Sequence, residues 1–176
     1  MDLRSLDAGE LTLAAQLDRL VAESLDARRH RLVFVEKVPD AAFSLWARAK
    51  ATREPDDVAY LDLQGDGQSL VTGCIVGLDV SGDDLDEALN VVLNGRSVVL
   101  VSGLDRSRAR LGERLFRWLD WSATHLPLTV ATTREAAAYV VRLRHHNVAV
   151  VQILDSRLSA DAAALAGRAI QSRQDP

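Results

Sequence analysis

The sequence predicts an α/β protein, a three-layer α/β/α sandwich built on a mainly parallel sheet of about five strands. Short apolar runs rich in β-branched residues alternate along the chain with longer segments of helical periodicity. The runs lack the polar alternation of a half-exposed strand, which is typical of parallel strands that helices cover on both faces. The chain has 176 residues, of which 48% are hydrophobic, so it is long and apolar enough to bury a sizeable core.

The first elements follow from changes in the hydrophobic period. Apolar residues at helical spacing predict an amphipathic helix over about residues 10–27. The continuous apolar runs 32–35 and 58–63 predict two buried strands, and the segment 41–52 between them predicts a helix. Several glycines then indicate a loop, with room for one short strand at 70–76.

The second half of the chain repeats this alternation. A serine followed by acidic residues predicts a helix that starts at residue 81 and ends near the Asn-Gly pair 94–95. Apolar runs predict three further strands at 97–101, 127–131 and 148–153. Apolar residues at helical spacing predict the helices between them, over about 108–124 and 135–143.

Residues 1–171 are predicted to form one domain. An alanine-rich segment over about 159–170 predicts its last helix, and the polar residues 172–176 predict a flexible tail.

Composition limits the function classes. The single cysteine, Cys74, excludes an internal disulfide framework and a Cys-based zinc site. A formal net charge of −4 argues against a general nucleic-acid binder. Residues 1–30 carry no secretory leader, and no stretch approaches the ~18 apolar residues of a membrane span. We therefore expect a soluble, cytoplasmic protein that does not enter a membrane.

Polar residues follow the predicted strands, at the edge where an open parallel sheet binds its ligands. The candidates for this ligand edge are Lys37, Asp62, Ser102, Asp105, Thr133 and Arg134. Their mixed charges suit an anion or an acidic partner. The alternative is that they are ordinary charged loop ends facing solvent.

Two segments carry a family resemblance. Residues 98–105 read Val-Val-Leu-Val-Ser-Gly-Leu-Asp, and residues 128–134 read Leu-Thr-Val-Ala-Thr-Thr-Arg after a long helix. With the order of helices and strands over about residues 11–155, they resemble the core of P-loop NTPases, and are most similar to the AAA+ and STAND branches. The resemblance implies a Walker B acid on the strand of the first segment and a polar sensor residue at the end of the strand of the second segment.

The chain departs from this family where nucleotide chemistry needs it most. A Walker A loop needs glycines that cradle phosphate, then a lysine and a Ser or Thr for magnesium. Residues 36–42 read Glu-Lys-Val-Pro-Asp-Ala-Ala, without a glycine, and the later glycine run 65–73 has no lysine after its last glycine. Ser102 stands at the position of the Walker B acid. The resemblance therefore implies a degenerate member that does not hydrolyse nucleotide.

Arginines and a tryptophan gather on the helix after the third main strand. The candidates for partner binding are Arg106, Arg108, Arg110, Arg114, Arg117 and Trp121. An exposed tryptophan beside arginines suits the anchor of a protein interface, whereas a core position is the alternative for Trp121. Trp118 continues the apolar stripe and is predicted to lie in the core. The arginines have no stacking aromatic residues interleaved with them for bases, and Asp and Glu are plentiful nearby, so nucleic acid is the less favoured partner.

The sequence predicts no catalytic residue, no metal and no cofactor. It has no Gly-x-Ser-x-Gly motif and no histidine placed to serve Ser102 as a base. Its four histidines lack the spacing of a metal site.

The sequence thus favours a non-catalytic adaptor or regulatory protein that binds another protein within a larger complex, with a second copy of the chain as a further candidate partner. The first alternative is an α/β enzyme or nucleotide-binding protein that uses the ligand edge. A second is a regulatory domain of the STAS type, although Arg-Ser-Arg at 106–108 replaces the usual phosphorylation turn. A third is an accessory factor of a bacterial phage-defence system of the BREX type.

Overall fold

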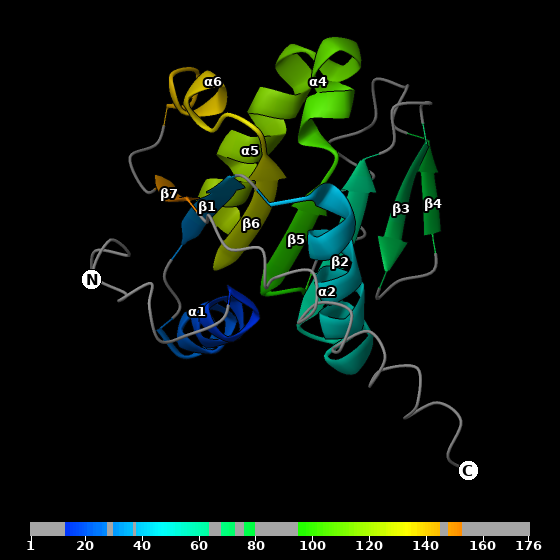
Figure 1. The fold of residues 1–176 in the computed structure, drawn as a ribbon, viewed down its shortest axis with the longest axis vertical. Coiled ribbons are helices and arrows are strands. Elements are labelled where there is room, and N and C mark those ends of the chain that lie inside the picture. Colours follow the sequence, from blue (N-terminus) through cyan, green and yellow to red (C-terminus); the bar gives the residue numbers. More distant parts are fainter. Residues whose placement is uncertain are drawn as a thin grey trace.

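The computed structural model describes most of the predicted sheet and the helices around it (Figure 1). The described residues are 13–27, 30–36, 38–63, 68–72, 76–79, 95–144 and 148–152. The predicted helices over 81–94 and 159–170, the tail 172–176 and the candidate Lys37 lie outside these residues.

A seven-stranded sheet forms the centre of the described part of the chain, in the order β4-β3-β2-β5-β6-β1-β7. Its strands are β1 (Arg31–Glu36), β2 (Val58–Leu63), β3 (Gln68–Thr72), β4 (Val76–Asp79), β5 (Val98–Ser102), β6 (Leu128–Thr133) and β7 (Val148–Gln152). The pairs β2–β5, β5–β6, β6–β1 and β1–β7 are parallel. This confirms an α/β protein with a parallel sheet.

The number of strands predicted, about five, is wrong because the glycine-rich region contributes two strands to the sheet. β3 pairs antiparallel with β2, and β4 pairs antiparallel with β3. The sequence analysis allowed only one short strand here, at 70–76. Short runs flanked by glycine carry a weak strand signal by themselves, and β3 is stabilised by pairing with β2, which no local pattern reveals.

The parallel strands β2, β5 and β6 are buried along their whole length, and successive residues face opposite sides of the sheet. In β5, Val98 and Leu100 belong to one hydrophobic core, whereas Val99 and Val101 belong to the other. The continuous apolar runs of the sequence therefore mark strands covered on both faces.

Helices α1 (Leu13–Ala27) and α2 (Asp40–Arg53) cover one face of the sheet (Figure 1). Leu17, Leu20 and Val21 of α1 and Phe43 and Trp46 of α2 pack into the core on this side. Lys50 of α2 also forms ion pairs with Asp18 of α1, at 3.2 Å, and with Glu54, at 2.8 Å. The pair with Asp18 links the two helices, whereas the pair with Glu54 lies at the end of α2 itself.

Helices α4 (Leu104–Leu111), α5 (Glu113–His125) and α6 (Ala137–Val140) cover the other face. The single helix predicted over 108–124 is wrong, because Gly112 separates α4 from α5 with a φ of +49°. The helix predicted over 135–143 is reduced to a short turn of helix. Trp118 is only 2% exposed, as its place in the apolar stripe predicts. None of the helices in the described part of the chain has the length and apolar character of a membrane-spanning segment.

Candidate functional site

The carboxyl ends of the parallel strands bring polar residues from distant parts of the chain to one edge. Asp62 at the end of β2 pairs in register with Ser102 at the end of β5, and Glu36 at the end of β1 pairs with Thr133 at the end of β6. Helix α4 begins directly beyond β5 and carries Asp105 and Arg106 over the same edge. The side chains at this edge form two networks of hydrogen bonds.

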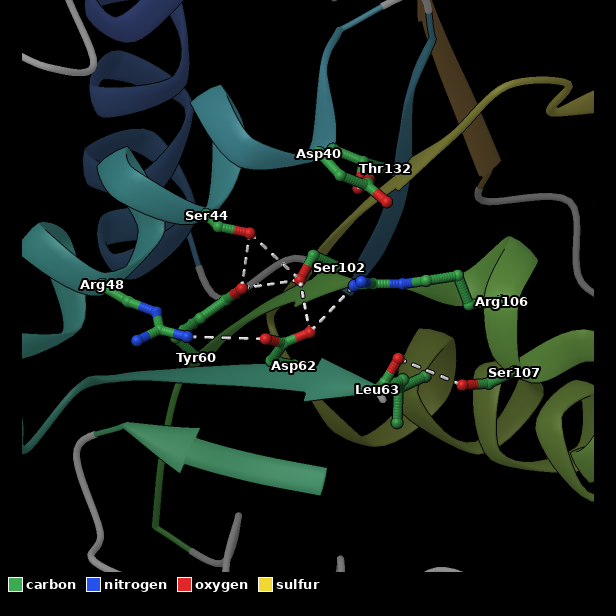
Figure 2. A network of polar contacts seen from close by, with 10 residues as sticks. All are labelled: Asp40, Ser44, Arg48, Tyr60, Asp62, Leu63, Ser102, Arg106, Ser107 and Thr132. Atoms are coloured by element: carbon green, nitrogen blue, oxygen red, sulfur yellow. Dashed lines mark hydrogen bonds and ion pairs between the residues drawn. The ribbon is translucent and has the colours of Figure 1, made fainter. Parts of the chain in front are cut away.

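The Ser102 network contains Ser44, Arg48, Tyr60, Asp62, Ser102 and Arg106 (Figure 2). Ser102 is fully buried, and its Oγ lies 2.6 Å from the Tyr60 hydroxyl oxygen and 3.4 Å from Ser44 Oγ. The Tyr60 hydroxyl also donates to Ser44 Oγ over 2.8 Å. Ser102 donates in turn to Asp62 Oδ1 over 3.2 Å. The hydroxyl of Ser102 therefore holds the carboxylate of Asp62 from the protein interior, and the hydroxyls of Tyr60 and Ser44 hold Ser102.

Two arginines hold the same carboxylate from the surface. Arg48 Nη2 of α2 lies 3.5 Å from Asp62 Oδ2, and Arg106 Nη2 of α4 lies 3.2 Å from Asp62 Oδ1. Figure 2 shows the two side chains reaching Asp62 from opposite sides. The guanidinium of Arg48 also lies over the ring of Tyr60, 5.6 Å from its centroid. Asp62 is thus the shared partner of cations from helices on the two faces of the sheet.

Gly103 allows the backbone to turn from β5 into α4 beside the end of β2. Its φ is +81°, a left-handed conformation that glycine adopts without strain. A Cβ atom at this position would lie 2.1 Å from the carbonyl oxygen of Leu63. The same carbonyl accepts a hydrogen bond from Ser107 Oγ, at 3.2 Å. The chain therefore turns from β5 into α4 in close contact with the end of β2.

The Asp105 network contains Asp105, Thr133, Arg134 and Tyr139. Thr133 Oγ1 and the Tyr139 hydroxyl each donate to Asp105 Oδ1 over 2.8 Å. The backbone N–H of Arg134 donates to Asp105 Oδ2 over 2.9 Å. One carboxylate from α4 therefore fixes the end of β6 and the short helix α6.

Two further carboxylates bind the chain itself near the end of β1. Glu36 Oε1 accepts the backbone N–H of Ala136 at 2.5 Å, and Asp40 Oδ1 accepts the hydroxyl of Thr132 at 2.9 Å. Glu36 is only 7% exposed. No group of three or more His, Cys, Asp or Glu side chains is placed to hold a metal ion among the residues that the structure describes.

Both tyrosines of the chain have a raised pKa. Burial raises the pKa of Tyr60, although its hydrogen bonds to Ser102 and Ser44 and the charge of Arg48 act in the opposite direction. Burial also raises the pKa of Tyr139, and the hydrogen bond to Asp105 and the negative charge of that residue raise it further. The guanidinium of Arg108, 5.3 Å from the ring centroid, lowers the pKa of Tyr139 by a smaller amount.

We expect the folded protein to form less tyrosinate than free tyrosine at the same alkaline pH, because the pKa of both tyrosines of the sequence is raised. Stability that depends on a raised pKa is fully present below the unfolded value, about 10. It is lost as the pH rises toward the folded values, since the unfolded chain releases its protons first. Ultraviolet titration of tyrosinate, together with urea unfolding at several alkaline pH values, measures both effects. The double variant Tyr60→Phe/Tyr139→Phe should lose the part of the alkaline dependence that the tyrosines cause. The part due to Lys50 should persist, since burial lowers the pKa of Lys50 but its contacts with Glu54 and Asp18 raise it overall. A normal tyrosine titration of the folded protein would contradict the expectation.

The structure groups most of the predicted ligand edge into the two networks. Asp62 and Ser102 meet in the first, and Asp105, Thr133 and Arg134 meet in the second, where Arg134 contributes its backbone N–H. Residue 134 itself is exposed at this edge.

The predicted partner-binding residues have different surroundings. Arg106 belongs to the Ser102 network, and Arg108 lies over the ring of Tyr139. Arg110 and Arg114 are partly buried, whereas Arg117 is exposed. Trp121 is partly buried against the core and stacks on His125, with ring centroids 4.8 Å apart. Trp121 is therefore neither fully buried in the core nor fully exposed.

Sequence reasoning missed Ser44, Arg48, Tyr60 and Tyr139 as site residues. Ser44 and Arg48 lie four residues apart, so they share one face of α2, and this spacing was an available signal. Tyr60 precedes Asp62 by two positions, which places both on the same side of β2. Tyr139 carried no such signal, because α6 is short and its position depends on Asp105.

No protein family model matches the chain, and neither a curated protein nor a solved structure matches it.

Proposed function

We propose that the protein is a non-catalytic adaptor or regulatory protein with a degenerate P-loop NTPase-like fold, which acts by binding another protein within a larger complex. The observation that carries the proposal is the environment of Ser102. This residue stands where the family resemblance expects a Walker B acid, and its hydroxyl is fully buried among Tyr60, Ser44 and Asp62. A buried hydroxyl offers no carboxylate for magnesium, which prefers charged oxygen ligands.

The order of the parallel strands supports the family resemblance. Numbered along the chain, the parallel strands β1, β2, β5, β6 and β7 lie side by side in the order 5-1-4-3-2. This differs from the common dinucleotide-binding order 3-2-1-4-5-6 and from the flavodoxin-like order 2-1-3-4-5. It is the order expected of the P-loop NTPase core that the sequence resembles. Helices on both faces are consistent with the three-layer α/β/α organisation of such a core.

The hydrogen bonding of the sheet edge supports a loss of nucleotide chemistry. Asp105 accepts three donors of its own chain, Asp62 faces two arginines and Ser102, and Glu36 accepts the N–H of Ala136. The segment 36–42 has no glycine whose N–H groups could cradle a phosphate. The acidic groups of this edge thus stabilise the fold.

We expect isothermal titration calorimetry to detect no micromolar binding of ATP, with or without magnesium. Phosphate release should stay at the level of a buffer control. Micromolar, magnesium-dependent binding or turnover would overturn the proposal and favour the nucleotide-binding alternative. The variant Asp105→Asn separates the protein's own turnover from a contaminating ATPase, because only the former should respond to the substitution.

The partner protein can be sought by affinity capture. Affinity capture from the host cytoplasm, where we expect the protein to act, should recover a partner protein. Light scattering after size-exclusion chromatography separates a second copy of the chain from a different partner, because self-association depends on the concentration of the purified protein alone. A protein that captures no partner and stays monomeric at every concentration would contradict the adaptor proposal.

A further inference from the structure

The two arginines of the Ser102 network converge on one carboxylate although they come from helices on opposite faces of the sheet. The side chains of Arg48 and Arg106 are 46% and 52% exposed, whereas that of Asp62 is 11% exposed. Asp62 therefore lies at the base of the arrangement, and the guanidinium groups form its outer part.

Each guanidinium uses little of its hydrogen-bonding capacity on Asp62. An arginine has five N–H donors, and the forked arrangement binds a carboxylate best through two of them. Here Arg48 and Arg106 each contact Asp62 through a single Nη2 atom, at 3.5 and 3.2 Å. Among the residues that the structure describes, donors of both exposed side chains remain for an oxyanion from outside.

The charge of the arrangement defines the oxyanion that it suits. Two guanidinium cations and one carboxylate leave a formal charge of +1 at the mouth of the site. A single carboxylate neutralises this charge. A phosphate dianion or a nucleotide polyphosphate would bring a surplus of negative charge close to Asp62, which disfavours it.

The site is also held in place before any ligand arrives. Ser102 donates to Asp62, and Ser102 is itself fixed by Tyr60 and Ser44, so the carboxylate that orients both arginines has a defined position. The contact of Arg48 with the ring of Tyr60 restricts that side chain further.

We propose that Arg48 and Arg106 form a clamp that binds a carboxylate of a partner protein, an Asp or Glu side chain or a carboxyl terminus, with Asp62 orienting both guanidiniums from below. The nature of the occupant rests on the proposed adaptor function. The location lies beyond the carboxyl ends of β2 and β5, where parallel sheets bind ligands.

The test uses a short glutamate peptide as the probe, with acetate and inorganic phosphate as comparison anions at equal ionic strength. Proton–nitrogen NMR spectra follow the side-chain Nε–H signals of the arginines during each titration. We expect the peptide to shift the signals of Arg48 and Arg106 with one common dissociation constant, and acetate to shift the same two signals. Phosphate that binds more tightly than the carboxylates would overturn the choice of ligand.

Variants test the two parts of the clamp. Arg48→Gln and Arg106→Gln should each weaken peptide binding about three- to fivefold, the range of an exposed ion pair. Arg53→Gln, which removes the same charge from an exposed position on the same helix, should leave the affinity unchanged. Asp62→Asn removes the charge that orients the two guanidiniums, so the signals of Arg48 and Arg106 should no longer shift with one common dissociation constant. A common shift that persists in Asp62→Asn would overturn the orienting role of Asp62.

Equal losses of peptide affinity in Arg53→Gln and Arg48→Gln would show that only the net charge of the protein matters. That result would overturn the proposal. So would wild-type titrations in which Arg48 and Arg106 do not shift together. The wild-type titration needs no variant to fold, so it decides the question alone if a substitution unfolds the chain. Failure of the adaptor function has a different signature, namely calorimetric binding of ATP.

Discussion

Gly103→Ala should lower the free energy of unfolding by at least about 3 kcal/mol, because it combines backbone strain with a collision. The φ of +81° is unfavourable for any residue with a Cβ atom, and the added methyl group would lie 2.1 Å from the Leu63 carbonyl oxygen. That oxygen belongs to the backbone of a fully buried strand, so it cannot move aside alone. The end of β2 and the start of α4 would have to separate. Urea unfolding followed by circular dichroism measures the loss.

Gly95 serves as the matched control. Its φ, +84°, is close to that of Gly103, but a Cβ atom there meets no described heavy atom within 4 Å. Gly95→Ala should therefore cost only the strain of the backbone, about 1–2 kcal/mol. An equal loss in the two variants would show that the close approach of Gly103 to Leu63 is unimportant.

Asp105→Asn should lower the free energy of unfolding by about 2–3 kcal/mol, since it disrupts a carboxylate that accepts three hydrogen bonds. An asparagine keeps one acceptor oxygen and replaces the other with an NH₂ group. That NH₂ group would face a donor that the second carboxylate oxygen accepts in the native protein. Either the hydroxyls of Thr133 and Tyr139 or the N–H of Arg134 then lose their acceptor. Both hydroxyls belong to buried residues, where an unpaired polar group is costly. Thermal and urea unfolding measure the change.

Asp120→Asn provides the control for this substitution. The carboxylate of Asp120 accepts one backbone N–H, from Arg144, at 3.0 Å and at an exposed position. Its replacement should cost well under half as much. A double-mutant cycle of Asp105→Asn with Tyr139→Phe should show coupling, because the two side chains share one hydrogen bond. Additive losses would contradict the network described for Asp105.

The sequence predicted the regular elements well where the signal is local. The second strand occupies residues 58–63 as predicted, and the first helix and the other parallel strands agree within a few residues at their ends. Each was recognised from the spacing of its own apolar residues. The hairpin of β3 and β4 and the break at Gly112 escaped this approach. The hairpin depends on pairing with β2, and Gly112 lies within an apolar stripe that continues on both sides of it.

The candidate site was predictable only in part, because the strand order decides which residues meet. Asp62 and Ser102 were selected as strand-end residues, but that they are neighbours follows only from the pairing of β2 with β5. Asp105 was selected for its place after a strand, while its three donors come from β6 and α6. Arg48 comes from a helix on the opposite face to α4, so no motif along the chain could have joined it to Arg106.

The break at Gly112 lets the connection between β5 and β6 fit the length of the sheet. A continuous helix over residues 104–125 would be about 33 Å long, at 1.5 Å per residue, whereas a six-residue strand spans about 20 Å. Such a rod would extend well past the amino ends of the strands it connects. Dividing it lets α5 match the length of the sheet while α4 stays above the carboxyl edge (Figure 1). The length of the strands thus determines where the surplus turns of helix, and the charges they carry, are placed.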